Sequence, residues 1–385
     1  MNQQPRLAIV HDWLITQGGA EQVLKSLMEN WPQAPIYTLL YDPEGACGEW
    51  TTDRQIITSF LQHMPASRKR HRLFLPLMPL AIEQLDLEQY DILLSSSYAV
   101  AKGILTRPNQ LHISYVHTPM RYAWDLQNLY LRQTGLDRKV VGFLARLILH
   151  YMRLWDQASA NRVDVFLANS RHTAGRIWKT YRRKAEVIYP PVDTEYFTPG
   201  DQRGDYYLTI SRLVPYKRID LIVQAFSEMP DKKLVVIGDG PDGKKLRAQA
   251  GKNVTFLGYQ PTETLRQYMR NAKAFVFAAL EDFGITPVEA QSCGKPVIAY
   301  YGGGALETVI EGVSGVFFPE QSVVSLQSAV LDFETRQHLF DPAAIRQNAA
   351  RFSKIRFMQE IKEAVERAWE KFKMMGGQKW SALDE

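Results

Sequence analysis

Two glutamates in the second half of the chain have the spacing and surroundings of a phosphate-binding site. Glu281 and Glu289 are separated by seven residues and follow a strand-like apolar run at 274–279. Thr286 is expected to cap the next helix, with Pro287 at its first position. The N–H groups of such a helix start favour phosphate, and Glu289, in the first turn, could accept hydrogen bonds from a ribose diol. Glu281 would lie on the other side of the loop, where ligands collect in open α/β sheets.

Two cations form a second candidate site. Arg212 and Lys217 bracket the loop between a strand expected at 206–210 and a helix expected at 219–229. A diphosphate between them would meet a guanidinium fork and an ammonium group. Both patterns have an alternative interpretation: the glutamates as a solvated loop residue and a helix residue stabilised by the dipole, and the cations as a solvated pair.

The first half of the chain has candidate residues at the ends of two expected strands. Gly18 and Gly19 form the turn between a strand at 6–10 and the following helix, and would leave N–H groups pointing outward. A simple tight turn is the alternative. His117 follows a strand at 113–116 and precedes an aromatic-rich loop, a placement that suits the lining of a cleft. A hydrogen-bonded structural histidine is the alternative there.

Together these patterns resemble a known family. Ser-Arg-Leu-x-x-x-Lys at 211–217, the glycine turn at 238–241 and the glutamate pair in its Phe-Gly-Ile setting are similar to signatures of retaining glycosyltransferases of the GT-B fold, in the glycogen-synthase-like (glycosyltransferase family 4) group. The resemblance covers almost the whole chain. It implies an α/β fold of GT-B architecture, with two Rossmann-like domains, an interdomain cleft and a C-terminal helix that crosses back to the first domain.

The resemblance also implies a role for each candidate residue. The implied catalytic residues are His117 and Glu281, which would contact the transferred sugar, with Arg212 and Lys217, which would bind the donor diphosphate. The implied donor-binding set is Gly18, Gly19, Arg212, Lys217, Gly238, Tyr259, Phe283, Gly284, Ile285, Thr286 and Glu289. Within it, Tyr259 would lie near the nucleotide base and Glu289 would hold the ribose. The implied acceptor-binding set is Asp12, Arg121, Tyr122 and Trp124.

The length of the chain and the distribution of its prolines predict two domains. At 385 residues the chain exceeds what one hydrophobic core usually supports. A segment at 186–200 with three prolines is typical of a linker. We expect an acceptor-binding Rossmann-like domain at 1–190 and a nucleotide-sugar-binding one at 191–352. At 353–385 we expect a long helix, capped by Ser353, that packs back on the first domain and ends in a mobile tail.

Two segments combine basic and apolar residues. Ser67–Arg72 is strongly basic and precedes an apolar stretch at 73–80. A helix expected at 138–155 has cations at every seventh position from Lys139. Both suit the surface of an anionic membrane. A solvated charge run and an ordinary amphipathic helix are the alternatives.

Composition indicates which broad class of protein this is. Hydrophobic residues make up 45% and charged residues 23%, as in ordinary soluble globular proteins. No apolar run reaches the length of about 18 residues typical of a spanning helix, and the first residues lack the features of a signal peptide. Cys47 and Cys293 suggest no disulfide framework and fit a reducing cytoplasm. The basic and apolar segments described above suit attachment to the inner face of the membrane. A net charge of +5 and a pI near 9.0 permit anionic partners such as nucleotide sugars or acidic lipid.

We therefore expect a retaining hexosyltransferase that uses neither a metal nor a cofactor, takes a nucleotide sugar as donor and a saccharide or lipid-linked saccharide as acceptor, and binds no nucleic acid. No Asp-x-Asp motif occurs, so Arg212, Lys217 and the helix start at Thr286 would neutralise the leaving diphosphate. The resemblance of 120–125 and 302–315 to mannosyltransferases favours GDP-mannose, for surface polysaccharide or glycolipid synthesis. The alternatives are UDP-glucose or another UDP-hexose, a GT-B sugar-nucleotide epimerase or phosphorylase, and a non-catalytic sugar-binding module.

Overall fold

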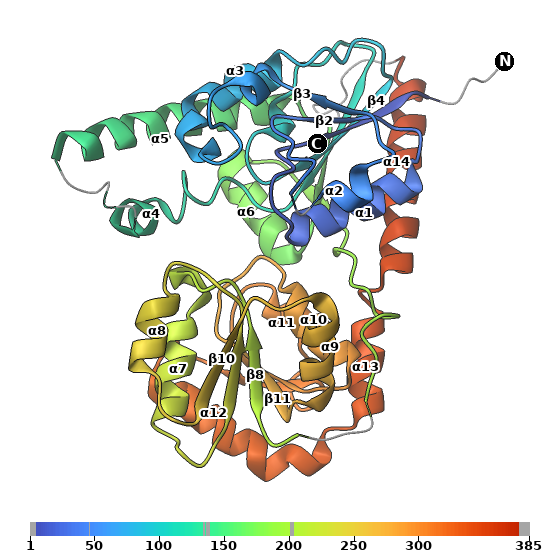
Figure 1. Ribbon diagram of the computed structural model, residues 1–385. Helices are drawn as coiled ribbons and strands as arrows, with labels where there is room; N and C mark the ends of the chain where they lie inside the picture. The colour runs from blue at the N-terminus through green and yellow to red at the C-terminus, as the bar shows by residue number, and fades with distance from the viewer. Residues whose placement is uncertain (1–4, 46, 134, 136–138, 201–203, 377–385) are drawn as a thin grey trace. The chain divides into compact units, whose positions relative to one another are not determined.

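The chain folds into two compact units. The computed structural model describes residues 5–376 apart from 46, 134, 136–138 and 201–203. The first unit comprises Met1–Tyr189 and Met358–Glu385, and the second comprises Pro190–Phe357. The division falls one residue before the boundary expected between 190 and 191. Figure 1 shows that each unit has its own sheet with helices packed around it.

The first unit is built on a parallel sheet of seven strands in the order β3-β2-β1-β4-β5-β6-β7. The strands are β1 (Leu7–His11), β2 (Ile36–Thr38), β3 (Ile56–Thr58), β4 (Ile92–Ser97), β5 (Leu111–Val116), β6 (Val165–Ala168) and β7 (Ala185–Val187). The central strands β1, β4 and β5 are buried along their whole length, as expected for a parallel sheet covered on both faces. The strand order reverses between β1 and β4, which is where ligands bind in open α/β sheets.

The helices of the first unit connect these strands. They are α1 (Gly19–Asn30), α2 (Gly48–Thr51), α3 (Met78–Glu83), α4 (Gln127–Gln133), α5 (Lys139–Ser159) and α6 (Arg171–Tyr181), with the short 3-10 helices η1 (Phe60–His63), η2 (His71–Leu77), η3 (Ala101–Gly103) and η4 (Ala160–Arg162). Helix α5 is the one expected at 138–155; Arg138 and the side chain of Lys139 lie outside the described residues. Among the described residues, no helix is long and apolar enough to cross a membrane.

The second unit repeats the design with six parallel strands in the order β10-β9-β8-β11-β12-β13. The strands are β8 (Tyr207–Ile210), β9 (Leu234–Ile237), β10 (Val254–Gly258), β11 (Ala274–Phe277), β12 (Val297–Tyr300) and β13 (Gly315–Phe318). The helices are α7 (Ile219–Ser227), α8 (Gly243–Gln249), α9 (Thr262–Asn271), α10 (Ile285–Ser292), α11 (Ala305–Thr308), α12 (Val323–Arg336) and α13 (Pro342–Ala350), with the 3-10 helices η5 (Pro215–Lys217) and η6 (Gln337–Leu339). Separate apolar clusters cover the two faces of this sheet, and the strand order reverses between β8 and β11.

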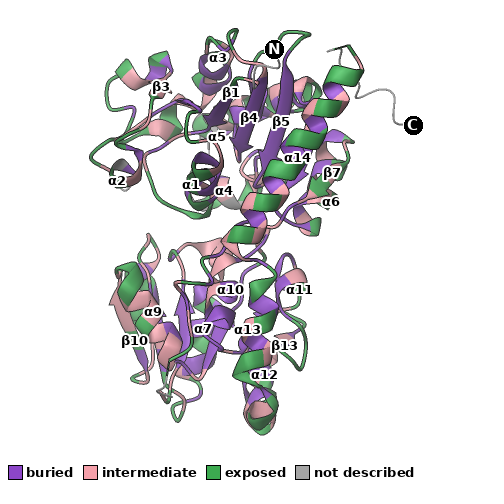
Figure 2. Ribbon diagram, turned by 90° about the vertical axis from the view of Figure 1, so that its right-hand side faces the viewer, coloured by how far each residue is buried: buried purple, intermediate pink, exposed green. Residues whose placement is uncertain are grey.

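The last helix, α14 (Lys354–Met374), begins in the second unit and joins the first from Met358 onward. Ser353 Oγ accepts from the Arg356 N–H at 3.4 Å and caps the helix as predicted. Asn30 Nδ2 of α1 donates to the Met358 carbonyl at 2.7 Å. Figure 2 shows α14 with alternating buried and exposed stripes, and its buried side includes Ile361 and Phe372. The expected mobile tail lies outside the described residues from 377 onward.

One expected boundary was wrong. The proposed linker at 186–200 begins inside β7, because Glu186 pairs with Leu167 of β6 and extends the sheet by one edge strand. The irregular segment starts only after this strand. The prolines that predicted the linker all lie beyond it.

Candidate functional site

In the second unit, the structure brings together two groups that the sequence analysis predicted separately. The β8–α7 loop contains Arg212, which is exposed, and ends in η5 with Lys217. Lys217 Nζ forms an ion pair with Glu281 Oε1, which comes from the loop after β11, and both side chains are mostly buried. This ion pair joins the loop after β8, which also contains Arg212, to the loop after β11 at the carboxyl edge of the sheet.

Glycines let the loops under this cluster lie in direct contact. Gly238 has a φ of +130°, and a Cβ there would lie 1.9 Å from the Ser211 carbonyl oxygen. At Gly240 a Cβ would lie 2.4 Å from the carbonyl oxygen of Leu213. The turn after β9 therefore supports the backbone that carries Arg212. Gly238, expected to bind donor, contributes in the structure by this close approach.

The helix that follows Glu281 starts earlier than predicted. Gly284 is the N-cap of α10 with a φ of +89°, and no side chain caps the helix. Thr286 is the second helical residue, so its predicted capping role is wrong. Pro287 is the third residue, a position whose N–H has no partner within a helix. Ile285 becomes the first residue, and with Thr286 it forms the open helix start that favours an anion.

Glu289 is also placed differently from the prediction. It is the fifth residue of α10 rather than part of the first turn. Burial, reinforced by the nearby charge of Asp193, raises the pKa of its carboxyl group to about 7. The burial that raises this pKa also leaves the carboxyl group poorly hydrated, and its oxygens can accept hydrogen bonds. It therefore retains the chemistry needed to hold a pair of hydroxyls.

The two remaining donor candidates differ sharply in exposure. Phe283 is 4% exposed and packs edge to face with Phe352, with ring centroids 5.4 Å apart. It thus supports the Glu281 loop from below. Tyr259 is 82% exposed, directly after Gly258 at the end of β10, so its ring is accessible to a planar ligand.

A glycine pair after β12, Gly303 and Gly304, lies directly beneath the Glu281 loop. A Cβ at Gly303 would lie 2.3 Å from the Glu281 carbonyl oxygen, and one at Gly304 would lie 2.3 Å from the Phe283 Cα. The Gly304 N–H donates to the Glu281 carbonyl at 2.8 Å. These glycines therefore fix the position of the Glu281 loop.

In the first unit, a chain of polar side chains lies at the carboxyl ends of β1, β4 and β5. Glu21 Oε1 lies 3.5 Å from His11 Nε2, and His11 Nδ1 lies 3.1 Å from Ser96 Oγ. Ser96 Oγ is 2.8 Å from His117 Nε2. Burial, reinforced by His11, lowers the pKa of His117 to about 3, so its imidazole is neutral. Of these four residues only His117 was predicted. The signal that could have found Ser96 is the polar run Ser95–Ser97 at the end of an apolar strand.

Asp12, which was predicted to contact an acceptor, binds the backbone of a neighbouring turn in the structure. Its buried carboxylate accepts four backbone hydrogen bonds, from the N–H groups of Tyr98, Ala99, Val100 and Ala101, at 2.6 to 3.0 Å. Burial raises the pKa of Asp12, while these donors oppose that shift. The carboxylate thus holds the turn after β4 against the end of β1.

The glycine turn after β1 is covered by a carboxylate. Gly18 is the extended N-cap of α1 and Gly19 is its first residue. Glu21, in the first turn, is buried, and a Cβ on Gly18 would lie 3.1 Å from its Oε2. Because a negative charge already lies at this helix start, the expected approach of donor phosphates to Gly18 and Gly19 would have to displace or protonate Glu21.

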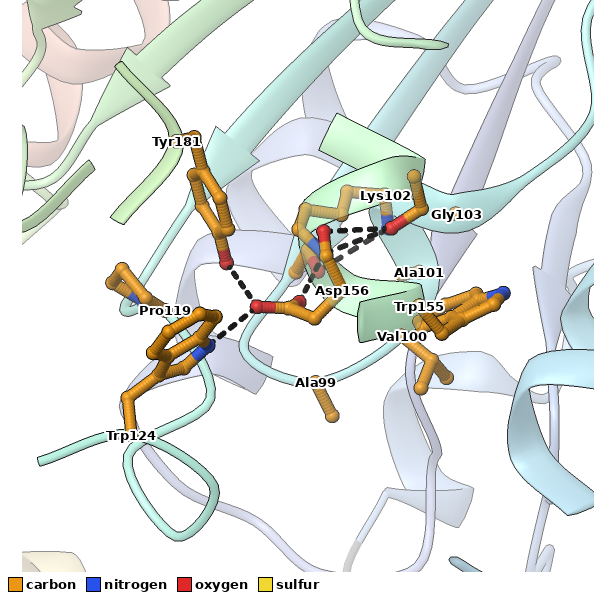
Figure 3. A network of polar contacts seen from close by, with 12 residues as sticks. Ala99, Val100, Ala101, Lys102, Gly103, Pro119, Trp124, Trp155, Asp156 and Tyr181 are labelled. Carbon is orange, nitrogen blue, oxygen red and sulfur yellow. Dashed lines mark hydrogen bonds and ion pairs between the residues drawn. The ribbon is translucent and has the colours of Figure 1, made fainter. Parts of the chain in front are cut away.

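The other three predicted acceptor residues, Arg121, Tyr122 and Trp124, lie in the loop after β5, and a buried ion pair anchors that loop (Figure 3). Trp124 Nε1 donates to Asp156 Oδ2 of α5 at 2.7 Å, and the Tyr181 hydroxyl donates to the same oxygen at 2.8 Å. The other Asp156 oxygen pairs with Lys102, which is 1% exposed. The Trp124 indole is therefore held in one orientation from α5.

Arg121 and Tyr122 complete the same loop. Both residues are half-buried. The Tyr122 hydroxyl is buried and, among the described residues, has no hydrogen-bond partner. A buried hydroxyl without a partner is costly, so a ligand hydroxyl that reaches it would be favoured. Among the described residues, no cluster of His, Cys, Asp and Glu side chains could hold a metal ion.

We expect Asp12→Asn to lower the free energy of unfolding by about 3 kcal/mol, because an amide nitrogen would face N–H donors inside the protein. Urea unfolding at neutral pH measures the change. Asp86→Asn is the matched control, since the Asp86 carboxylate accepts a single exposed N–H, from Glu88. Equal small effects of both substitutions would contradict the role assigned to Asp12.

The raised pKa of Glu289 predicts a pH-dependent effect of Glu289→Gln. Between the ordinary carboxyl pKa and the folded value near 7, the folded chain holds a proton that the unfolded chain releases, so stability falls as pH rises. Glutamine does not titrate, so the melting temperature of the variant relative to wild type should rise between about pH 5 and about pH 8.5. The exposed control Glu366→Gln should show no such trend. A constant difference across this range would refute the assignment.

Comparisons with known proteins match both units. Residues 17–196 match the family described as Glycosyltransferase Family 4, and residues 198–352 match Glycosyl transferases group 1. The D-inositol 3-phosphate glycosyltransferase of Mycobacteroides abscessus is 27% identical over 224 residues, which are 51% of this chain and 50% of that protein. The GDP-mannose-dependent alpha-(1-6)-phosphatidylinositol monomannoside mannosyltransferase of Mycolicibacterium smegmatis is 32% identical over 203 residues, 45% of this chain and 53% of that one. The chain thus spans about half the length of the curated relatives it matches.

Solved structures match the fold over nearly the whole chain. HepE of Anabaena, crystallised with UDP and glucose, aligns with a TM-score of 0.69 at 18% identity and covers 94% of this chain and 100% of its own. Sucrose-phosphate synthase of Thermosynechococcus elongatus aligns with a TM-score of 0.72 at 17% identity and covers 96% and 100%. With two parallel α/β units and a family match on each, the chain belongs to the family 4 type of glycosyltransferases with the GT-B fold.

Proposed function

We propose that the chain transfers a hexose from a nucleotide sugar to a saccharide or lipid-linked saccharide and forms an α-glycosidic bond with retention of configuration. The observation that carries this proposal is the Lys217–Glu281 pair beside Arg212 and the start of α10. It combines cationic and N–H groups suited to a diphosphate with a carboxylate suited to sugar hydroxyls. A protein that only bound sugar would have no need to stabilise a leaving diphosphate.

The reaction proposed for this site breaks the bond between the anomeric carbon and the diphosphate oxygen. Arg212, Lys217 and the N–H groups at the start of α10 stabilise the electron pair that leaves with the diphosphate, so the step needs no metal. The acceptor hydroxyl then attacks the oxocarbenium-like sugar from the face that the diphosphate leaves. Its proton can pass to the departing phosphate oxygen.

The other proposed contacts follow from the chemistry of each group. Glu281 would hold the sugar hydroxyls and Glu289 the ribose. His117, neutral because of its lowered pKa, would contact the sugar as an uncharged hydrogen-bonding group. Tyr122 and Trp124, in the anchored loop of the first unit, would contact the acceptor.

GDP-mannose is the proposed donor. It is supported by the similarity to the GDP-mannose-dependent mannosyltransferase of Mycolicibacterium smegmatis and by the mannosyltransferase-like segments at 120–125 and 302–315. UDP-glucose is the competing donor, since HepE, which has the same fold, was crystallised with UDP-glucose. We further propose that the protein acts in the cytoplasm in contact with the inner face of an anionic membrane, in the synthesis of surface polysaccharide or glycolipid.

We expect only guanine nucleotides to raise the melting temperature substantially, among GDP, UDP, ADP, GDP-mannose and UDP-glucose tested without metal. A ligand at a hundred times its dissociation constant stabilises the fold by about 2.7 kcal/mol. A shift confined to uracil nucleotides would contradict GDP-mannose and support a UDP-hexose as the donor. No shift with any nucleotide sugar would contradict the proposed function.

We expect Arg212→Ala to reduce kcat by about a hundredfold or more, because it removes a charge that stabilises the leaving diphosphate. Glu281→Gln should reduce transfer as well, since it replaces one of the two carboxylate oxygens that accept from sugar hydroxyls and removes the charge that pairs with Lys217. Lys244→Ala, an exposed cation on α8, is the control and should transfer at the wild-type rate. Turnover of the guanine or uracil nucleotide sugar that shifts the melting temperature measures these rates.

Product analysis in the same assay separates the mechanisms. An α linkage seen by NMR supports retention, and a β linkage would overturn it. Release of an isomerised nucleotide sugar would indicate the epimerase alternative. Dependence on inorganic phosphate would indicate a phosphorylase.

A further inference from the structure

Helix α5 has a second apolar face that the described residues of its own unit leave exposed. Its inner face packs on the core through Leu149 and Met152. The opposite face exposes large hydrophobic side chains, and Phe143 and Leu154 are 64% and 58% exposed. This outer face consists of Phe143, Leu144, Leu147, Tyr151 and Leu154. Figure 1 shows the first half of α5 extending past the rest of the first unit, with α4 near its beginning.

The spacing of these residues shows that the outer face is continuous. Positions 143, 147 and 154 form one row, and positions 144 and 151 form the adjacent row, at the three- and four-residue spacing of a helix surface. Both rows lie opposite Leu149. A surface helix normally exposes polar residues there, so an apolar patch of this size marks an interaction surface.

Helix α5 carries cationic side chains and no carboxylate before Asp156. Arg146 and His150 lie along one edge and are exposed. The sequence has no Asp or Glu from 138 to 155. It also has none from 54 to 82, and this segment includes the exposed cations Lys69, Arg70 and Arg72 of η2 and its approach.

The η2 segment lies close to α5. It leads directly into α3, whose Met78 and Ile82 share a core cluster with Leu149 and Met152. Leu73 of η2 and Leu80 of α3 are exposed, at 71% and 49%. The first unit therefore presents a second apolar and basic surface next to α5.

We propose that the outer face of α5, supported by the η2 segment, docks on an anionic lipid bilayer. An interfacial helix inserts an apolar face among the acyl chains and keeps cations at the headgroups. A second copy of the chain is a poorer occupant, because a two-fold contact through this face would bring Arg146 of each copy toward like charges.

The inner face of the same helix connects this surface to the proposed acceptor loop. Asp156, one of the last residues of α5, accepts the hydrogen bond of Trp124. Docking of α5 would therefore hold the Trp124 loop close to the bilayer. If the proposed function holds, on which this step alone rests, the acceptor is a saccharide linked to a lipid.

Vesicle flotation with the full chain tests the surface. Wild type should bind vesicles of phosphatidylcholine with phosphatidylglycerol and bind phosphatidylcholine alone more weakly, with loss of binding at high salt. Leu147→Asn should weaken binding to the mixed vesicles about tenfold. Leu331→Asn is the matched control, because Leu331 on α12 is 52% exposed and Leu147 is 48% exposed.

Arg146→Gln tests the charge component. It should weaken binding to the anionic vesicles about fivefold and leave binding to phosphatidylcholine unchanged. Lys244→Gln on α8 is its control. Equal binding by wild type and Leu147→Asn, or no binding by wild type, would overturn the proposal. So would a doubled molar mass in light scattering that Leu147→Asn abolishes, since a second copy would then cover the face.

The nucleotide melting shift keeps this test separate from the proposed function. Leu147→Asn should show the same shift as wild type, because the outer face of α5 lies outside the proposed donor site. If the wild-type protein shows the nucleotide shift but binds no vesicles, only the proposed membrane surface is contradicted. If it binds vesicles but shows no nucleotide shift, only the proposed function is contradicted.

Discussion

The parallel arrangement of strands is the constraint on which both candidate sites depend. Because the strands run in the same direction, their carboxyl ends all lie at one edge of the sheet. Each crossover connection begins at this edge, so the loops after the strands collect there. In the first unit this edge receives His11, Ser96 and His117 from three strands. In the second unit it receives Lys217 after β8 and Glu281 after β11. Groups far apart in the sequence therefore become neighbours without any local signal that they will meet.

Close backbone contact beneath these loops explains why the second unit needs glycine where it does. The Arg212 loop rests on Gly238 and Gly240, and the Glu281 loop rests on Gly303 and Gly304. A side chain at any of these four positions would collide with main-chain atoms, which cannot move aside as a flexible side chain can. The glycines thus give rigidity to the site. A preorganised site of this kind stabilises charge without reorganising during the reaction.

The elements could be predicted from the sequence because buried parallel strands leave continuous apolar runs. The Arg212/Lys217 and Glu281/Glu289 patterns marked two loops of the second unit that the Lys217–Glu281 ion pair joins in the structure. The network around His11 and Glu21 could not be predicted, because it forms only when β1 lies beside β4, and His11 and Ser96 are 85 positions apart in the sequence. The cap at Thr286 was wrong because the Thr-Pro pair imitates a helix start, whereas Gly284 turns the chain earlier. The four backbone N–H groups that donate to Asp12 could not be predicted, because they follow β4 and Asp12 follows β1.

Helix α5 has two faces with different environments, the protein interior on one side and the surroundings of the molecule on the other. Its inner face carries Asp156, whose charge is balanced by Lys102 and whose other oxygen is held by Trp124 and Tyr181. Breaking such a buried pair is costly, because it leaves an uncompensated charge inside the protein, so α5 cannot shift independently of the loop that it anchors. Its outer face is apolar and gains nothing from water. A contact that fixes the outer face of α5 therefore also fixes the position of Trp124. The link between the two is the buried hydrogen-bonded network around Asp156, which is stiff.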